Sequence, residues 1–254
     1  MYHTMNLVSQ ANKIMGLIIN GEVNKVTMEI DHLLDQDSTD VLTLLNQILS
    51  QPETLTLLIR RILADGGLFK KMAADSYYHE NGFHKIVLLS GRNFKLRVHH
   101  FGACAKIPME NIHDHRWAFA SSILSGTLEM DVFKKATTHH TGHKYIHYIY
   151  NSDKSTGAYS TKEVGLVSLK KTESRCYHAG QNYLMLPKEL HQIKNTPGQE
   201  SLTLILTGKP INSTCNLFAG REIQDEEKQT VQYEEAQLKT MLLKIIEKLY
   251  PQLN

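Results

Sequence analysis

The chain has 254 residues, which is enough for one domain with appended elements or for two small domains. Its 28 basic and 26 acidic residues give a formal net charge of +2, so the composition provides no electrostatic footprint for nucleic acid or a membrane surface. No apolar run approaches the ~18 residues of a membrane-spanning helix, and the first residues lack the pattern of a signal peptide. We therefore expect a soluble, cytoplasmic protein with neither a nucleic-acid partner nor a membrane partner.

Residues 1–76 are predicted to form an N-terminal helical segment. Apolar residues between positions 41 and 48 recur at helical spacing, and Pro52 suits the first turn of the next helix. We expect that helix to end at Gly66-Gly67, because glycine is common just past the last helical turn.

Residues 77–210 are predicted to be β-rich. Short segments of strand-forming residues alternate with turns that contain Gly, Pro, Asn or Ser, including a break at Ser125-Gly126. The expected strands are 85–89, 94–101, 118–124, 128–133, 144–150, 165–170, 183–186 and 202–207. Many short strands with frequent turns favour an antiparallel sandwich or barrel.

Residues 211–254 are predicted to form a connector to about position 220 and then a helix that ends at Tyr250, before Pro251. The helix has one apolar stripe. Its members are Leu238, Met241, Leu242, Ile245, Ile246 and Leu249. The stripe fits packing onto the barrel or against a second copy in a homodimer, and the sequence does not separate the two.

A pair of histidines, His113 and His115, flanks Asp114 in the β-rich region. Side chains alternate along a strand, so both imidazoles are expected on one face. Neutral imidazole is the commonest metal ligand in proteins. The pair is therefore a candidate for half of a metal site.

A distant segment, residues 180–195, supplies a third histidine in a glycine- and proline-containing context. Together the two segments resemble the two motifs of the cupin superfamily. The matching positions are His113, His115 and Gly126 in the first motif, and Gly180, His191 and Asn195 in the second. Pro187 falls one position late, and Glu189 or its neighbour stands where the second motif has a glycine. The resemblance, over about residues 85–208, implies a mainly β fold, a cupin-type double-stranded β-helix (jelly-roll) barrel flanked by N-terminal helices and a C-terminal helix.

The resemblance also implies the composition of a metal site. The glutamate that most cupins use would fall at Phe119 or Ala120, and neither side chain can bind a metal. The implied ligands are therefore His113, His115 and His191. About three positions of an octahedral ion would stay open, which suits Fe(II) with substrate and O₂, although Zn, Ni, Mn or Cu also fit the same donors.

Within the cupins, residues 111–115 and 123–129 are similar to the first motif of thiol dioxygenases of the cysteine dioxygenase type. That family's crosslinked cysteine would fall at Phe119 or Ala120, its carboxylate-binding arginine near His84 and its catalytic tyrosine near Thr207, and all three are absent. The likeness implies a mononuclear non-haem metal-dependent oxygenase that acts on a small molecule with O₂. A metal-dependent isomerase or lyase and a non-catalytic ligand-binding cupin are the alternatives.

Several side chains are candidates for the substrate pocket. Trp117 and Phe119 share the parity of the two histidines, so they either wall the pocket or fill the core. Arg97 is a candidate for binding an anionic group of the substrate. Asp114 and Arg116 have the opposite parity, and we expect an exposed pair or a contact that holds the strand from outside. Four further histidines between positions 139 and 147 are expected in and beside a solvated loop rather than in a second metal site.

Overall fold

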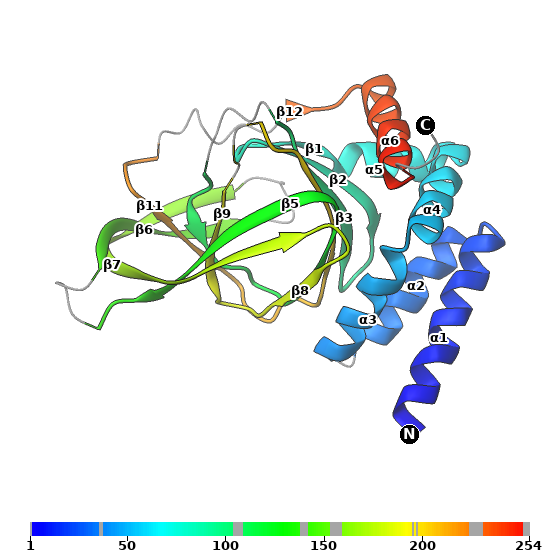
Figure 1. The fold of residues 1–254 in the computed structure, drawn as a ribbon, viewed down its shortest axis with the longest axis horizontal. Coiled ribbons are helices and arrows are strands. Elements are labelled where there is room, and N and C mark those ends of the chain that lie inside the picture. Colours follow the sequence, from blue (N-terminus) through cyan, green and yellow to red (C-terminus); the bar gives the residue numbers. More distant parts are fainter. Residues whose placement is uncertain are drawn as a thin grey trace.

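The fold comes from a computed structural model, which describes residues 2–35, 38–103, 109–137, 142–152, 159–194, 196, 198–223 and 231–250. The N-terminal segment is helical, as predicted. Its helices are α1 (Tyr2–Ile19), α2 (Val23–Leu34), α3 (Thr39–Leu49), α4 (Pro52–Ala64) and α5 (Gly66–Asp75). They lie together on one side of the strands, with α6 (Glu235–Leu249) above them (Figure 1). None of the helices in the described residues is long and apolar enough to cross a membrane.

The glycine pair begins a helix instead of ending one, which corrects the expectation for Gly66-Gly67. Helix α4 ends at Ala64, and α5 starts at Gly66. The Asp65 side chain accepts hydrogen bonds from the backbone N–H groups of Gly67 and Leu68, at 2.9 and 3.0 Å. An aspartate cap supplies acceptors for the unpaired first N–H groups of a helix. Here this stabilisation outweighs the low helix propensity of the two glycines.

The strands form two antiparallel sheets that share β5. Their bounds are β1 (Tyr77–His79), β2 (Phe83–Ser90), β3 (Lys95–Phe101), β4 (Ile112–His113), β5 (Phe119–Lys135), β6 (His143–Ser152), β7 (Tyr159–His178), β8 (Asn182–Met185), β9 (Leu190–Lys194), β10 (Ser201–Thr207), β11 (Cys215–Ala219) and β12 (Val231–Gln232). The first sheet runs β12-β1-β2-β3-β10-β5, with β8 on the other side of β5. The second runs β5-β7-β6-β11-β4-β9 and closes because β9 also pairs with β5.

The break expected at Ser125-Gly126 is wrong, because β5 is one bent strand there. Its first half pairs with β10 and β8, and its second half pairs with β7 and β9. The bend lies at Gly126, whose φ is +75°, and a Cβ at this position would lie 1.9 Å from the carbonyl oxygen of Glu200. A positive φ and a close backbone approach both favour glycine. Gly126, which in the sequence indicates a turn, therefore lies where β5 passes from one sheet to the other.

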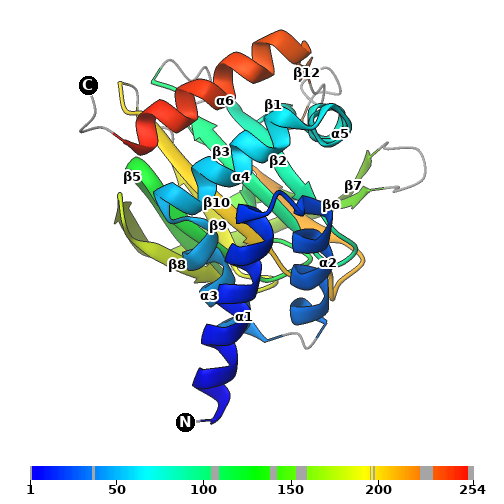
Figure 2. The same cartoon turned by 90° about the vertical axis from the view of Figure 1, so that its right-hand side faces the viewer.

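The two faces of the first sheet pack against different apolar clusters. One large apolar cluster joins the helices to the outer face of the first sheet, through residues such as Leu96, Leu204 and Leu206. Figure 2 shows this helical layer in front of the strands. A second cluster fills the space between the sheets, through residues such as Phe119 and Ile193. The predicted architecture, a mainly β jelly-roll barrel with helices at both ends of the chain, is confirmed.

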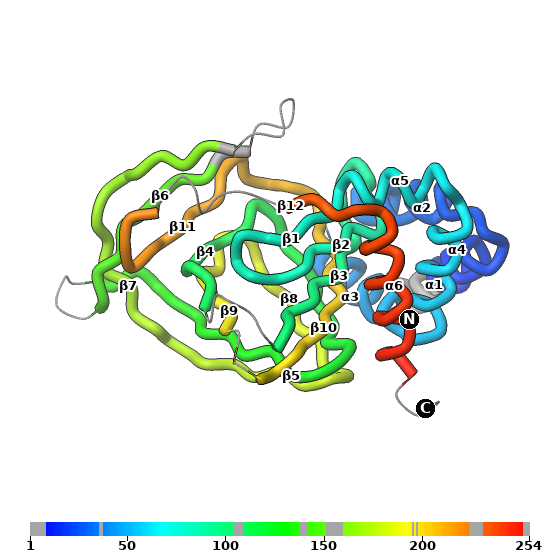
Figure 3. Tube along the Cα trace, turned by 90° about the horizontal axis from the view of Figure 1, so that it is seen from above, coloured from blue at the N-terminus to red at the C-terminus, as the bar shows by residue number. Residues whose placement is uncertain are grey.

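Strands β4 and β9 complete the second sheet between β11 and β5. In the view from above they lie between β6 and β11 on one side and β3 and β10 on the other (Figure 3). A third apolar cluster, which includes Ile112 of β4, Leu190 of β9 and Phe218 of β11, packs on one face of these three strands. Because side chains alternate along strands, His113 and His191 project to the opposite side, toward the cluster between the sheets.

The C-terminal helix begins later than predicted. Helix α6 spans Glu235–Leu249, and β11 and β12 occupy part of the expected connector and helix. Residues 224–230, part of the expected helix, lie outside the described residues. The apolar stripe of α6 joins the cluster between the helices and the first sheet, so it packs onto its own chain.

Candidate metal centre

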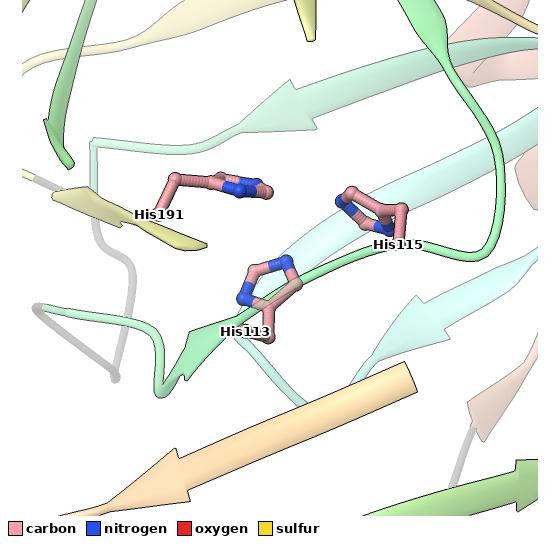
Figure 4. Close-up of side chains that lie close together, drawn as sticks. All are labelled: His113, His115 and His191. Carbon is pink, nitrogen blue, oxygen red and sulfur yellow. The ribbon is translucent and has the colours of Figure 1, made fainter. Parts of the chain in front are cut away.

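The three histidines singled out by the sequence lie together in the structure. His113 ends β4 and His191 lies in β9, where the two residues are cross-strand partners. His115 lies two residues beyond His113, outside the strand. One ring nitrogen from each histidine lies within 4.8 Å of the others, and the three imidazoles point toward one another (Figure 4). The ring centroids are 4.9 Å apart for His113–His115, 4.5 Å for His113–His191 and 5.1 Å for His115–His191.

Backbone carbonyl groups select the tautomer of two of these imidazoles. Nδ1 of His113 is 2.9 Å from the carbonyl oxygen of Asn111, and Nδ1 of His191 is 3.1 Å from that of Glu189. A carbonyl oxygen only accepts hydrogen bonds, so Nδ1 of each neutral ring carries the hydrogen. Nε2 then keeps its lone pair free. This arrangement, in which the second ring nitrogen is held by an acceptor, is typical of metal-binding histidines.

Burial keeps the rings of His115 and His191 neutral. It lowers the pKa of His191 to about 3, with a further contribution from His113, and holds the pKa of His115 well below 6.5. A metal ion requires neutral imidazole, so protons compete little for these nitrogens at neutral pH. Three converging imidazole nitrogens therefore fit a divalent transition metal.

No carboxylate belongs to the group within the described residues. The Phe119 ring packs beside it, with its centroid 5.0 Å from that of His115 and 6.2 Å from that of His191. Phe119 is buried in the cluster between the sheets. The site is thus an all-histidine group against an aromatic wall.

Trp117 and Arg97 also lie at this site. The Trp117 ring stacks on His115 with 5.9 Å between centroids, and the Arg97 guanidinium carbon lies 5.3 Å from the Trp117 ring centre. Arg97 Nε is buried and has no hydrogen-bond partner among the described residues. Burial lowers the pKa of Arg97 to about 10, which leaves the guanidinium charged at neutral pH. A buried, charged donor without a partner is suited to an anionic ligand.

Two further polar side chains, Lys85 and His99, lie on the same sheet face as Arg97, and of these only His99 is suggested by the alternation of residues along 94–101. Lys85 pairs across strands with His99 and with Tyr77, and its Nζ donates to Tyr77 Oη at 2.6 Å. His99 Nε2 is buried without a hydrogen-bond partner among the described residues. Burial holds the pKa of both Lys85 and His99 well below the usual range. The sequence signal that could have identified Lys85 is a lysine at an inward-facing position of an otherwise apolar strand.

Asp114 is buried, so the exposed Asp114–Arg116 pair is wrong, and the alternative expectation, a contact that holds the strand, describes Asp114. Its carboxylate accepts hydrogen bonds from Asn216, and the Arg116 guanidinium lies 5.1 Å from the Trp117 ring centre instead. Strand β11 pairs with β4 and places Asn216 beside Asp114, and sequence spacing gives no sign of that long-range pairing.

Of the four histidines between positions 139 and 147, His139 and His140 lie outside the described residues. Asn195 of the second motif also lies outside them. His147 lies in β6, where its Nε2 is 2.8 Å from Asn216 Oδ1 and its ring stacks on Phe218. His147 therefore has a packing role in the structure.

Comparisons with known proteins give only distant structural matches. No protein-family model matches the chain, and no curated protein matches it in sequence. Among solved structures, hydroquinone 1,2-dioxygenase PnpCD matches at 12% identity and a TM-score of 0.33, over 56% of this chain and 71% of that one. A cupin-like protein from Thermotoga maritima matches at 11% identity and a TM-score of 0.33, over 61% and 86%. The polyketide cyclase RemF from Streptomyces resistomycificus matches at 15% and 0.30, over 57% and 76%. The chain's own strand pairing gives an antiparallel β barrel with a three-histidine group in it, which is the architecture that the sequence resemblance implies.

Proposed function

We propose that this protein is a mononuclear, non-haem metal-dependent dioxygenase that acts on a small molecule. One observation carries the proposal: His113, His115 and His191 present three converging nitrogens, and backbone carbonyls hold two of the rings with Nε2 free. Neutral donors without a carboxylate would leave about three positions of an octahedral ion open, by extension from the facial-triad sites of Fe(II) oxygenases. When bound, Fe(II) supplies the Lewis acidity and the redox chemistry of the reaction.

The protein's own side chains supply orientation and the exclusion of water. Trp117 and Phe119 flank His115 and form the apolar wall of the proposed site. The Arg97 guanidinium, placed over Trp117 with its Nε unpaired, binds an anionic group of the substrate. Bidentate pairing with guanidinium fixes both the position and the orientation of a carboxylate. The proposed substrate is therefore a small molecule that combines an anionic group with a second, metal-binding heteroatom.

Oxygen uptake tests the reaction class. The Fe(II)-loaded protein is assayed in an oxygen electrode against thiols and 1,3-dicarbonyl compounds, each as a carboxylate and as the neutral amide, with His191→Ala as the control. We expect uptake that depends on both compound and metal and is lost in the control. Conversion of a compound without oxygen uptake would indicate a metal-dependent isomerase or lyase. Absence of uptake with every compound would contradict the proposed dioxygenase activity.

A further inference from the structure

Asp114 is a buried carboxylate placed between two of the three histidines along the chain. Its side chain is 1% exposed. Oδ1 accepts from the Asn216 backbone N–H at 2.7 Å, and Oδ2 accepts from Asn216 Nδ2 at 2.5 Å. The Asp114 backbone N–H in turn donates to the Asn216 carbonyl oxygen at 3.1 Å. These contacts attach the residue between His113 and His115 to β11.

Lys188 joins the same carboxylate to the segment that carries the third histidine. Lys188 Nζ lies 3.7 Å from Asp114 Oδ2 and donates to the Thr214 carbonyl oxygen at 2.7 Å. The Lys188 backbone N–H donates to the carbonyl oxygen of His115 at 3.3 Å. One lysine therefore contacts both the His113–His115 segment and the chain that leads into β11, three residues before His191.

The backbone of Lys188 supports a specific role for its side chain. Its φ is +66°, the only positive value among the described residues other than glycine. Non-glycine residues rarely adopt this conformation, and they keep it where surrounding contacts hold it. Glycine would fit the backbone of this turn better, but it would lack the ammonium group.

We propose that Asp114 and Lys188 are positioning residues that hold the three imidazoles in place for the metal ion before it binds. Strand pairing joins the two histidine segments at His113 and His191 and, before them, at Met109 and Lys194, so His115 lies beyond the last paired residue. The Asp114–Lys188 contact, together with the bond from Lys188 to the His115 carbonyl, fixes the remaining segment. This inference rests on the metal site proposed above.

Two variants separate positioning from general stability. Asp114→Asn keeps the shape of the side chain and removes its charge, whereas Lys188→Gly removes the ammonium and relieves the positive φ. The matched control is Asp131→Asn. Asp131 is a buried carboxylate on β5, and it pairs with Lys194 of β9 at 3.0 Å on the face away from the histidines.

Co(II) binding provides the measurement. Affinity is measured by competition with a chelator, the site geometry by the Co(II) visible spectrum, and the stability of the metal-free protein by urea unfolding. We expect Asp114→Asn and Lys188→Gly to weaken Co(II) binding about 10- to 100-fold, the usual effect of removing a group that orients a ligand. Both variants should also alter the Co(II) spectrum. Asp131→Asn should change neither the Co(II) affinity nor the spectrum.

The outcome for Lys188→Gly is decisive, because its metal-free stability should match or exceed that of the wild type while its affinity falls. Wild-type affinity and spectrum in both variants, or an equal loss in Asp131→Asn, would overturn the positioning role. If the wild-type chain binds no Co(II), the proposed metal site itself is overturned, and with it this inference.

Discussion

His113 and His191 are cross-strand partners, and they are the pair through which β4 and β9 join. Their ring centroids lie 4.5 Å apart, and each Nδ1 meets a carbonyl oxygen two residues earlier in the chain. The same local geometry thus recurs on two strands that are far apart in sequence. Strand pairing brings the two rings together, and the backbone orients them.

Arg97 should determine a preference for anionic substrates. For any compound that the Fe(II)-loaded protein oxidises, Arg97→Met should lower kcat/KM for the carboxylate form by about 10- to 100-fold, because a hydrogen bond to a charged group contributes about 1.5–3 kcal/mol. The neutral amide should be affected much less. Oxygen uptake with both forms measures the difference.

Arg116 is the matched control for this prediction, since its guanidinium lies over the same Trp117 ring, at 5.1 Å. Arg116→Met should leave the preference for the carboxylate unchanged. A similar loss in both variants would assign the effect to the Trp117 ring or to general charge rather than to Arg97.

Acid should destabilise the metal-free protein through His191. Burial lowers the folded-state pKa of His191 to about 3, whereas the unfolded value is near 6.5. The unfolded state therefore binds more protons between these values, so this contribution to stability is complete above pH 6.5 and is lost as the pH falls toward 3. We expect this one group to reduce the free energy of unfolding by about 2 kcal/mol between pH 6.5 and 4.5.

Urea unfolding of chelator-treated protein at several pH values measures the effect. His191→Gln cannot take up the proton, so its unfolding free energy should fall less steeply with decreasing pH than that of the wild type. Identical slopes would show that His191 is not buried in the neutral form.

Gly126 should be essential for the bend in β5. Gly126→Ala forces a positive φ and places a Cβ 1.9 Å from the Glu200 carbonyl oxygen, so we expect a loss of more than about 3 kcal/mol in unfolding free energy. Gly180→Ala is the control. Gly180 has a φ of +85° with nothing within 4 Å of an added Cβ, so only the conformational cost of about 1–2 kcal/mol should appear. Equal losses would show that the backbone approach at Gly126 is unimportant.

Asn46 should couple the helical segment to the barrel. It is buried in α3, donates to the Leu204 carbonyl oxygen at 3.0 Å and accepts from Ser122 Oγ at 2.6 Å. Asn46→Ala leaves both barrel groups without this partner, which should cost about 1–3 kcal/mol of unfolding free energy. Gln47→Ala, at the next and less buried position, should change stability little. Thermal unfolding compares them, and equal effects would argue against the coupling.

The histidine group could be predicted because its signal is local. His113 and His115 share a short segment, and the resemblance of residues 180–195 to the second cupin motif added His191 to them. The helical N-terminal segment could likewise be predicted, from the helical spacing of its apolar residues. In each case, short stretches of chain carry the pattern.

Other features depend on contacts that no local pattern reveals. Asp114 contacts Asn216 because β11 pairs with β4, and Ser125-Gly126 lies within a strand that pairs with β10, where the Glu200 backbone passes close to Gly126. Lys85 became a candidate only when strand pairing placed it beside His99. The late start of α6 likewise follows from β12, a two-residue strand that extends the sheet edge beside β1.

Metal content tests the central claim most directly. The protein, purified without chelator and loaded anaerobically with Fe(II), should retain about one iron per chain after desalting. His191→Ala, which removes one of the three donors, should retain almost none under the same treatment. Less than ~0.2 equivalents of any transition metal in the wild type, or full iron retention by His191→Ala, would contradict a metal centre formed by His113, His115 and His191.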